Sequence, residues 1–382
     1  MRARITRLSI TVLLGLFAFA CTSALPPTPV PAPPKAAAPA VATTAPAAPA
    51  PKAAATPAAA APTSAPKAAA PAKPKTLTKV KAAYAAVSGN TVPTWIAADE
   101  KLFEKYGLDV ELSYIASGTT ATQAMVSGDV PLLAPVNGTA VMSAKLAGSD
   151  ATIIGITFNT AIFYLMVTPD INSPSDLKGK SLGITRFGSL TDFAVRFALR
   201  KMGLEPEKDV AILQMGGVPE ILSAMQTGAI AGGPLSSPTD LRARDAGMKE
   251  LMDIGAQGLQ YPGTAIATTQ TFIRNNRDTV LNFIRAKLEG TYLFKTNKEL
   301  SMKVLGKYTK TEDRKVLEGT WEAYSKKTEK IPYATKEAML AGIEELAASI
   351  PKAREANPDS FLDMQFVKQL EDSGFIKQLY KD

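Results

Sequence analysis

Short apolar runs and stretches of helical periodicity alternate along the chain from residue 76 onward. Apolar or alternating runs predict strands at Val80–Val87, Leu108–Tyr114, Val130–Ala134, Ala151–Thr157, Ile162–Thr168, Ser181–Thr185 and Val210–Gln214. Apolar residues at helical spacing predict helices at Val92–Tyr106, Thr119–Ser127, Thr139–Ala147, Leu190–Met202 and Pro219–Thr227. This alternation predicts an α/β fold with largely parallel sheets, and from Thr271 onward the pattern is almost entirely helical.

A weak internal repeat runs through the α/β part. The matched positions are Asp109-Val110 and Ala124-Met125 with Gly128 in one half, and Asp209-Val210 and Ala224-Met225 with Gly228 in the other. Any two strand–helix units share composition, but several matches in the same order predict two lobes built from one unit.

Polar, glycine-bearing loops follow several of the predicted strands. The first, Ser88–Thr91, lies between a strand and a helix with Pro93 in its first turn, and Asn90 or Thr91 is expected to cap that helix. In open parallel sheets ligands bind at the carboxyl ends of the strands, where helix N-termini offer N–H groups and a partial positive charge. The alternative is an ordinary capped turn.

The strand, this loop, the helix PTWIAADEKLFEKYGLDVEL and the glycine loop at Ser117–Gly118 together resemble one known family. It comprises the substrate-binding proteins of nitrate/sulfonate/taurine-type ABC importers and includes binders of thiamine pyrimidine precursors. The resemblance covers most of residues 76–382 and is strongest in 84–140 and 174–204. It implies a bilobal periplasmic-binding-protein fold (type II), with two parallel-sheet lobes, a hinge crossed twice and a helical C-terminal region packed on lobe one.

The crossings are expected near Thr168–Asp170 and Leu259–Pro262, which gives lobe one residues 76–168 plus 262–382 and lobe two residues 169–261. Loops of both lobes would then face one cleft. The candidate ligand-binding residues are Ser88, Gly89, Asn90, Thr91, Ser117, Gly118, Asn137, Gly138 and Asn159 in lobe one, and Arg186, Gly188, Ser189, Gly217, Gly233 and Tyr261 in lobe two. Each also has an ordinary explanation as a turn glycine, a helix cap or a core residue.

Arg186 is the candidate partner for an anionic ligand. It directly follows a predicted strand, lies beside Gly188 and precedes a predicted helix, so its guanidinium could pair with a sulfonate or carboxylate. In the alternative, Arg186 pairs with a surface acid and the ligand is neutral.

The N-terminal quarter of the chain differs in composition from the rest. Residues 1–20 carry Arg2, Arg4 and Arg7 before an apolar run, which is typical of a secretion leader and short for a membrane-spanning helix. Cys21, the only cysteine, follows Ala18-Phe19-Ala20, which resembles a bacterial lipoprotein cleavage box except that Leu is usual at position 18 and Phe19 is bulky. We therefore expect a lipid on Cys21 that anchors the protein at a membrane; the alternative is a plain signal peptide.

Residues 22–75 are rich in Ala, Pro, Thr and Lys and contain no acidic or aromatic residue, which predicts a disordered tether spanning residues 21–75. The first 75 residues hold eight of the 43 Lys and Arg residues and none of the 35 Asp and Glu residues, so residues 76–382 carry 35 of each sign. The net charge of +8 therefore gives no reason to expect nucleic-acid binding by the folded part.

The composition also argues against catalysis. The chain has no histidine, its one cysteine precedes the folded part, and no GxxxxGK[ST] or GxGxxG motif occurs. Pyrimidine-making enzymes of the broad family use histidine and cysteine clusters that this chain lacks.

We expect a monomeric extracytoplasmic solute receptor without a catalytic residue, cofactor or metal. The resemblance implies that it passes a small, anionic solute to a membrane permease driven by a separate ATPase. The alternatives are an enzyme on the same fold acting on a small heterocycle, a signalling receptor ectodomain, and a lipoprotein without a transport role.

Overall fold

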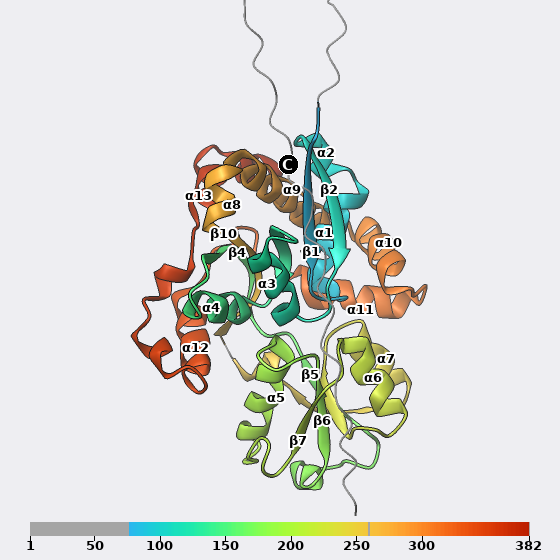
Figure 1. Cartoon of the computed structure of the whole chain (residues 1–382). Helices are drawn as coiled ribbons and strands as arrows, with labels where there is room; N and C mark the ends of the chain where they lie inside the picture. Colours follow the sequence, from blue (N-terminus) through green and yellow to red (C-terminus); the bar gives the residue numbers. More distant parts are fainter. Residues whose placement is uncertain (1–75, 259, 382) are drawn as a thin grey trace, which may run out of the picture. The chain divides into compact units, whose positions relative to one another are not determined.

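The computed structural model describes residues 76–258 and 260–381, and the predicted leader, Cys21 and the whole tether lie outside this part. It contains two five-stranded sheets (Figure 1). The first sheet has the order β2-β1-β3-β10-β4, with β1 Thr78–Tyr84, β2 Leu108–Tyr114, β3 Leu132–Val136, β4 Ala151–Thr160 and β10 Gln260–Thr269. The second has the order β7-β6-β8-β5-β9, with β5 Tyr164–Val167, β6 Ser181–Ile184, β7 Ala211–Gln214, β8 Gly232–Leu235 and β9 Lys249–Asp253. We call each sheet with its covering helices lobe one and lobe two.

One set of helices connects the strands of each sheet, and a second set, at the C-terminus, covers lobe one. The connecting helices are α1 Val92–Asp99, α2 Leu102–Lys105, α3 Gly118–Ser127, α4 Gly138–Leu146, α5 Leu190–Lys201, α6 Val218–Gln226 and α7 Thr239–Asp245. The C-terminal helices are α8 Gln270–Asn275, α9 Arg277–Thr296, α10 Lys298–Thr309, α11 Arg314–Ser325, α12 Lys336–Ala347, α13 Gln365–Asp372 and α14 Phe375–Leu379. Short 3-10 turns occur at Gly89–Thr91, Pro174–Leu177, Gly255–Gln257, Pro351–Glu355 and Pro358–Phe361. The helical C-terminal region predicted from the sequence is confirmed, and within the described residues no helix is long and apolar enough to cross a membrane.

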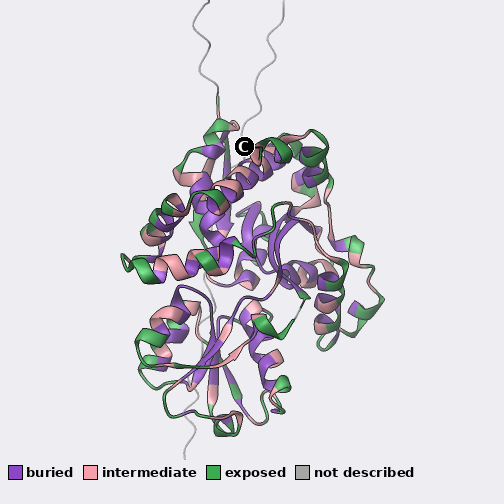
Figure 2. Ribbon diagram, turned by 180° about the vertical axis from the view of Figure 1, so that it is seen from behind, coloured by how far each residue is buried: buried purple, intermediate pink, exposed green. Residues whose placement is uncertain are grey.

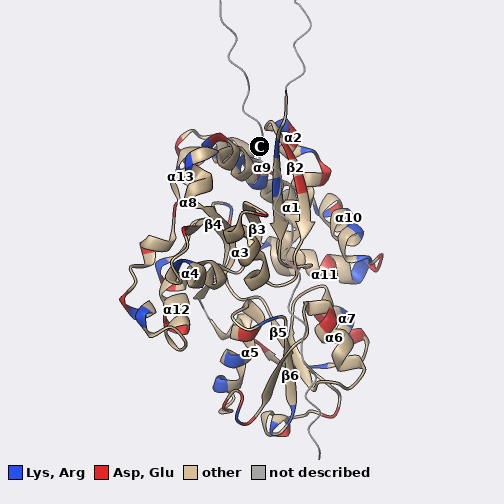
Figure 3. Cartoon of the chain, viewed as in Figure 1, with Lys and Arg blue, Asp and Glu red and all other residues tan. Residues whose placement is uncertain are grey.

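Both faces of the first sheet are buried. Leu132 and Ile154 belong to the core beneath α9, whereas their neighbours Leu133 and Ile153 belong to the core beneath α4 and α12. Successive strand residues point to opposite faces, so both sets must be apolar. Figure 2 shows these strands buried between helices whose outer faces are exposed, and Figure 3 shows charged residues on those outer faces, for example on α10 and α12.

The two lobes repeat one strand–helix unit. In each unit, one strand pairs in parallel with the two strands that follow it in sequence, β1 with β2 and β3, and β6 with β7 and β8. Met125 and Met225 occupy equivalent buried positions on α3 and α6, and Gly128 and Gly228 follow these helices with φ of 87° and 73°. The repeat predicted from the sequence therefore corresponds to equivalent elements of the two sheets.

The sheets are mixed, whereas the sequence predicted largely parallel sheets. β10 is antiparallel to β3 and β4, and β5 is antiparallel to β8 and β9. These two strands enter their sheets directly from the other lobe, at the end where the parallel strands finish, so they must run in the opposite direction. Pro262 and Gly263 interrupt the strand pattern of β10, and Gly232-Gly233-Pro234 made β8 resemble a loop.

The first crossing lies earlier than predicted. The chain leaves the first sheet after Thr160 and enters the second at Tyr164, so the strand assigned to lobe one before Thr168–Asp170 belongs to lobe two. No turn residues separate β4 from β5. The sequence therefore gave no sign that the chain changes lobes between them, and both strands were assigned to lobe one. The chain returns between Asp253 and Gln260.

The first predicted helix is interrupted. It divides into α1 and α2 around Lys101, whose φ is 54°. Neither Asn90 nor Thr91 caps α1, since no side chain caps this helix and the Thr91 hydroxyl instead donates to the carbonyl of Ala86 at 2.7 Å.

Candidate functional site

A cavity of about 70 Å³ lies between the two lobes. Residues that follow β1, β3, β6 and β7 line it, together with Tyr114 at the end of β2, residues of the first crossing, Thr264 of β10 and Tyr324 of α11. Parallel strands of both sheets therefore end at one cavity, as expected for the loop-borne sites of open α/β sheets.

Four helices begin at this cavity. The N-cap residues of α3, α4, α5 and α6 all line it, and these are Ser117, Asn137, Ser189 and Gly217. Each helix N-terminus contributes free N–H groups and a partial positive charge. None of the residues that line the cavity is Asp, Glu, Lys or Arg, so the helix termini dominate its electrostatics.

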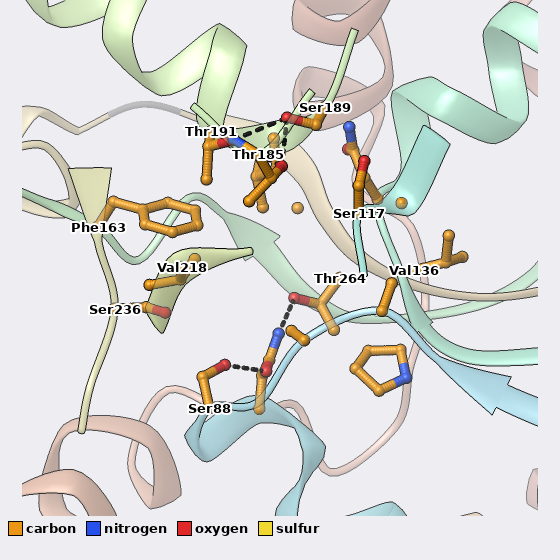
Figure 4. Close-up of a pocket in the computed structure, with 18 of the residues that line it drawn as sticks. Ser88, Ser117, Val136, Phe163, Thr185, Ser189, Thr191, Val218, Ser236 and Thr264 are labelled. Atoms are coloured by element: carbon orange, nitrogen blue, oxygen red, sulfur yellow. Dashed lines mark hydrogen bonds between the residues drawn. The ribbon is translucent and has the colours of Figure 1, made fainter. Parts of the chain in front are cut away.

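Lobe two contributes three mutually bonded hydroxyl groups. Those of Thr185, Ser189 and Thr191 lie 2.8–2.9 Å from one another (Figure 4). The Ser189 oxygen also accepts from the amide of Asp192, and the Thr191 oxygen accepts from the amide of Thr185. Each hydroxyl carries one hydrogen, so the three mutual bonds use all three hydrogens, and a ligand oxygen would accept from this cluster by taking the place of one of these bonds.

Lobe one contributes two buried polar atoms without partners, the hydroxyl of Ser117 and the side-chain nitrogen of Asn137. Ser117 is only 3% exposed, and its φ of 75° is rare and strained for a residue with a side chain. Leaving a buried donor unpaired costs free energy. Both features are typical of a residue held in place for a ligand.

A second polar cluster consists of Ser88, Asn90 and Thr264. The Ser88 hydroxyl donates to the Asn90 side-chain oxygen at 2.5 Å, and the Asn90 nitrogen donates to the Thr264 hydroxyl at 3.2 Å. Tyr324 lines the cavity beside this cluster; burial, and then the Asp240 carboxylate, raise the pKa of its phenol, which therefore stays neutral.

The structure brings part of the predicted site together. Seven of the candidate residues line the cavity: Ser88, Asn90, Ser117, Gly118, Asn137, Ser189 and Gly217. Ser189 also caps α5, as the sequence suggested, by accepting from the amide of Asp192.

Five of the other candidates make structural contacts instead. Gly89 lies against the ring of Tyr324 and donates its amide hydrogen to Ser237. Thr91 bonds Ala86, as described above. Gly138 lies against Pro262. Asn159 donates to the carbonyl of Tyr333 and accepts from the amide of Thr335, both at 3.0 Å. Gly233 lies within β8 against the backbone of Gly183.

The last three candidates lie around α5. Arg186 is exposed and does not line the cavity. Gly188 has a φ of 72° and donates its amide hydrogen to the carboxylate of Asp192. Tyr261 is fully buried; its ring stacks on Phe193 with 3.9 Å between the centroids, and its hydroxyl lies 2.6 Å from that of Thr139.

Other residues that line the cavity were not among the candidates, including Tyr114, Phe163, Thr185, Val218, Thr264 and Tyr324. Tyr114 and Thr185 end or directly follow predicted strands, so their positions carried a usable signal. Phe163 lies in a crossing, Thr264 in a strand that the sequence did not predict, and Tyr324 in a C-terminal helix. No local sequence pattern identifies these three as cavity residues. Within the described residues, no group of His, Cys, Asp and Glu is arranged to hold a metal ion.

Residues 88–299 match the family model described as "NMT1/THI5 like", which is more than half of the chain. The chain belongs to the NMT1/THI5-like family. Two proteins with assigned names are similar to this chain at nearly the same level of sequence identity. YtlA of Bacillus subtilis, named as a binding protein, is 23% identical over 216 residues, covering 56% of this chain and 65% of YtlA, slightly less than two thirds of its length. A Brachyspira hyodysenteriae protein named as an ABC transporter periplasmic binding protein is 24% identical over 266 residues, covering 65% of this chain and 74% of the relative.

Solved structures share the fold. A Bordetella bronchiseptica protein is similar with a TM-score of 0.70 and 20% identity, covering 78% of this chain and 98% of that one. The alkanesulfonate-binding protein SsuA of Xanthomonas axonopodis, bound to MOPS, gives 0.62 and 16% over 74% and 94% of the two chains. The nitrate-binding protein NrtA of Synechocystis gives 0.61 and 14% over 78% and 89%. The bilobal periplasmic-binding-protein fold expected for this NMT1/THI5-like chain is thereby confirmed.

Proposed function

We propose that this protein is the extracytoplasmic solute-binding component of an ABC importer, and that it captures a small oxyanion-bearing solute between its lobes. Membership of the NMT1/THI5-like family and the name of the Brachyspira relative support the transport role. A membrane permease and a separate ATPase are the partners that this role requires.

The observation that carries the proposal is the arrangement of neutral donors around Ser117. The N-termini of four helices, the hydroxyls of Thr185, Ser189 and Thr191, and the unpaired Ser117 hydroxyl border one cavity without a charged side chain. Hydrogen-bond donors and helix termini stabilise an anion without a formal positive charge. A cation would meet the same positive potential, which is unfavourable.

Arg186 is not part of this arrangement. It is exposed and lies outside the residues that line the cavity, so we assign the oxyanion to Ser117 and the hydroxyl cluster instead. The two assignments make opposite predictions for two single substitutions.

Calorimetry with a panel of sulfonates, carboxylates, nitrate and matched neutral amides tests the proposal. With the best anion, Ser117→Ala should weaken binding roughly ten- to a hundredfold, because one hydrogen bond to a charged group is lost. Arg186→Ala is the matched control and should leave affinity within about twofold of wild type. A neutral or cationic best ligand, or a large loss in Arg186→Ala alone, would contradict the proposal.

The membrane anchor is a separate part of the proposal. Cys21 follows a leader and precedes a long Ala/Pro-rich segment, and it is the only cysteine that could carry a lipid. Cys21→Ser should therefore move the protein from the membrane fraction to the soluble fraction on cell fractionation, whereas Ser23→Ala should not. Unchanged membrane association of Cys21→Ser would rule out the anchor.

An enzyme on the same fold remains the other candidate class. DszB, solved in complex with biphenyl-2-sulfinic acid, is an enzyme with a similar fold, at a TM-score of 0.56 and 13% identity. The side chains that line the present cavity are apolar, hydroxyl and amide groups, which can bind and orient an anion. This set favours binding over chemistry, and incubation of the bound anion with the protein should return it unchanged.

A further inference from the structure

We infer that the solute is an aromatic monoanion with a second, uncharged polar group at the end opposite its oxyanion, as in a 4-hydroxybenzoate or a 4-hydroxybenzenesulfonate. This inference rests on the proposed function and specifies the class of solute that the same cavity takes.

The cavity has two polar ends. The hydroxyl cluster of Thr185, Ser189 and Thr191 with Ser117 forms one, and the cluster of Ser88, Asn90 and Thr264 forms the other. In Figure 4 the first group lies at the top of the view and Ser88 at the bottom, with Phe163, Val218 and Val136 between them. A solute that reaches both ends must therefore cross an apolar middle.

Two aromatic side chains line the cavity in addition to Tyr324. Phe163 lies in the first crossing and is 8% exposed, and Tyr114 lines the cavity while remaining 40% exposed. The Tyr114 ring is held by stacking on Tyr84 with 5.5 Å between the centroids, and burial raises the pKa of its phenol to about 12, so it stays neutral. Rings pack on such side chains with an advantage beyond the apolar area they bury.

The size of the cavity leaves room for more than a small inorganic ion. Its volume of about 70 Å³ is several times the roughly 10–15 Å³ that one water molecule needs. Nitrate or methanesulfonate at the hydroxyl cluster would leave the aromatic wall and the Asn90 cluster in contact only with water. A ring fills that space and removes apolar surface from water.

The far end favours an uncharged polar group. The Asn90 nitrogen carries two hydrogens, and Thr264 takes one of them, so one N–H remains for the solute. No side chain that lines the cavity could neutralise a second charge, and an unpaired buried charge is very unfavourable. The solute is therefore a monoanion with a distal hydroxyl or carbonyl rather than a dianion.

Calorimetry on the full chain with matched probes tests this inference. The probes are benzoate, 4-hydroxybenzoate and terephthalate, their sulfonate counterparts, cyclohexanecarboxylate, methanesulfonate and nitrate. We expect benzoate or benzenesulfonate to bind about two- to tenfold more tightly than the saturated ring, which has similar apolar area. The 4-hydroxy compound should gain about another two- to tenfold through one hydrogen bond, and the dianions should not bind measurably.

Substitutions then assign each preference to its side chain. Phe163→Leu and, at the exposed rim, Tyr114→Leu should each reduce the preference for the aromatic over the saturated ring. Phe197→Leu changes an aromatic residue of α5 that does not line the cavity and should keep it. Asn90→Ala and Thr264→Val should bring the affinities for the 4-hydroxy and unsubstituted compounds to the same value. These readouts are ratios within one variant, so a general loss of affinity does not imitate them.

The outcomes separate this inference from the proposed function. If methanesulfonate or nitrate binds as tightly as the ring acids, the aromatic class is wrong while the oxyanion receptor stands. If the 4-hydroxy group brings no gain in wild type, the distal contact is wrong. If no anion in the panel binds at all, both the inference and the proposed function fail.

Discussion

At the scale of single residues, Lys287 places an amine inside lobe one. It lies on α9, is 3% exposed, and its side-chain nitrogen donates to the hydroxyl of Thr94 at 2.7 Å. Burial lowers the pKa of this amine to about 7, because no carboxylate bonds it among the described residues. The charged form is therefore unfavourable in the folded protein.

This pKa predicts how stability depends on pH. Below about pH 7 both states carry the proton, and the folded state bears the full cost of the buried charge. Between about pH 7 and 10.5 the unfolded chain binds more protons than the folded one, so the contribution of Lys287 to stability rises with pH. Lys287→Met should raise the free energy of unfolding by about 2–4 kcal/mol at pH 6, by little at pH 10, and flatten the profile between them.

Chemical denaturation at several pH values measures this effect, with exposed Lys303→Met as the control that should leave the profile unchanged. Thr94 keeps its hydrogen bond to the carbonyl of Ala134 after the substitution, so no new unpaired group arises. If Lys287→Met were less stable than wild type at pH 6, the buried amine would not be lowering the free energy of unfolding.

At this scale the sequence predicted the positions of site residues better than helix caps or side-chain directions. Ser117, Asn137 and Ser189 were found because a polar residue between a strand and a helix lies at the sheet edge, although the Ser117 side chain caps no helix. Arg186 meets the same rule of position, but its long side chain can turn to solvent, and it is exposed. Sequence adjacency gives the place of a residue on the chain and not the direction of its side chain.

At the scale of elements, the approach of α1 and α9 depends on Gly290. A β-carbon at Gly290 would overlap the carbonyl oxygen of Pro93 and come within 3.3 Å of the Ala97 side chain. The two helices therefore touch through backbone at this point, and Gly290 lies one turn from the buried Lys287.

Gly290→Ala should destabilise lobe one by about 1–3 kcal/mol, because overpacking at rigid backbone forces the helices apart. Gly319→Ala on α11 is the matched control, since its β-carbon would meet only the flexible end of Leu241 at 3.3 Å and alanine favours a helix. Thermal unfolding compares the two variants. Equal or greater stability of Gly290→Ala would mean that α1 and α9 can separate freely.

The success of element prediction followed the clarity of the flanking turns. Leu108–Tyr114 was predicted to the residue, and α3 to α6 within one residue at each end, because glycine and polar turn residues mark the ends of these segments. β8 and β10 were missed because glycine and proline interrupt them, although neighbouring strands bury both. Tertiary pairing, which a single segment does not report, decides the state of such runs.

At the scale of the whole folded part, the internal repeat in the sequence predicted two equivalent lobes. The repeat did not predict where the chain first crosses from one lobe to the other. Only strand pairing shows that Tyr164 begins lobe two. We propose lobe boundaries that follow the sheets, with residues 76–160 and 260–381 in lobe one and 164–253 in lobe two.

Contacts between the lobes lie on both sides of the cavity. The ring of Phe193 in lobe two stacks on Tyr261 in lobe one, and the Arg242 guanidinium of α7 donates to the carbonyl of Thr309 in α10 at 2.6 Å. Such contacts exist only while the lobes are together. A binding protein with two crossings is expected to open and close about them, so these contacts set the fraction of molecules ready to hold a solute.

Arg242→Ala should therefore weaken solute binding although Arg242 does not line the cavity. Loss of one charge-assisted hydrogen bond, about 1–2 kcal/mol, shifts the lobes toward separation and raises the apparent Kd by up to about five- to thirtyfold. Arg244→Ala is the matched control, because Arg244 lies on the same helix but pairs with Glu250 within lobe two. It should leave affinity nearly unchanged.

Calorimetry with the best anion of the panel gives the two affinities, and small-angle scattering gives the radius of gyration with and without that anion. The Arg242 variant without solute should be more expanded than wild type, and saturating solute should return it to the wild-type value, because binding and the lost contact act on the same equilibrium. Equal affinities for the Arg242 and Arg244 variants would show that this contact does not control closure. Weaker binding of Arg242→Ala with no expansion would place its effect in the cavity rather than in the movement of the lobes.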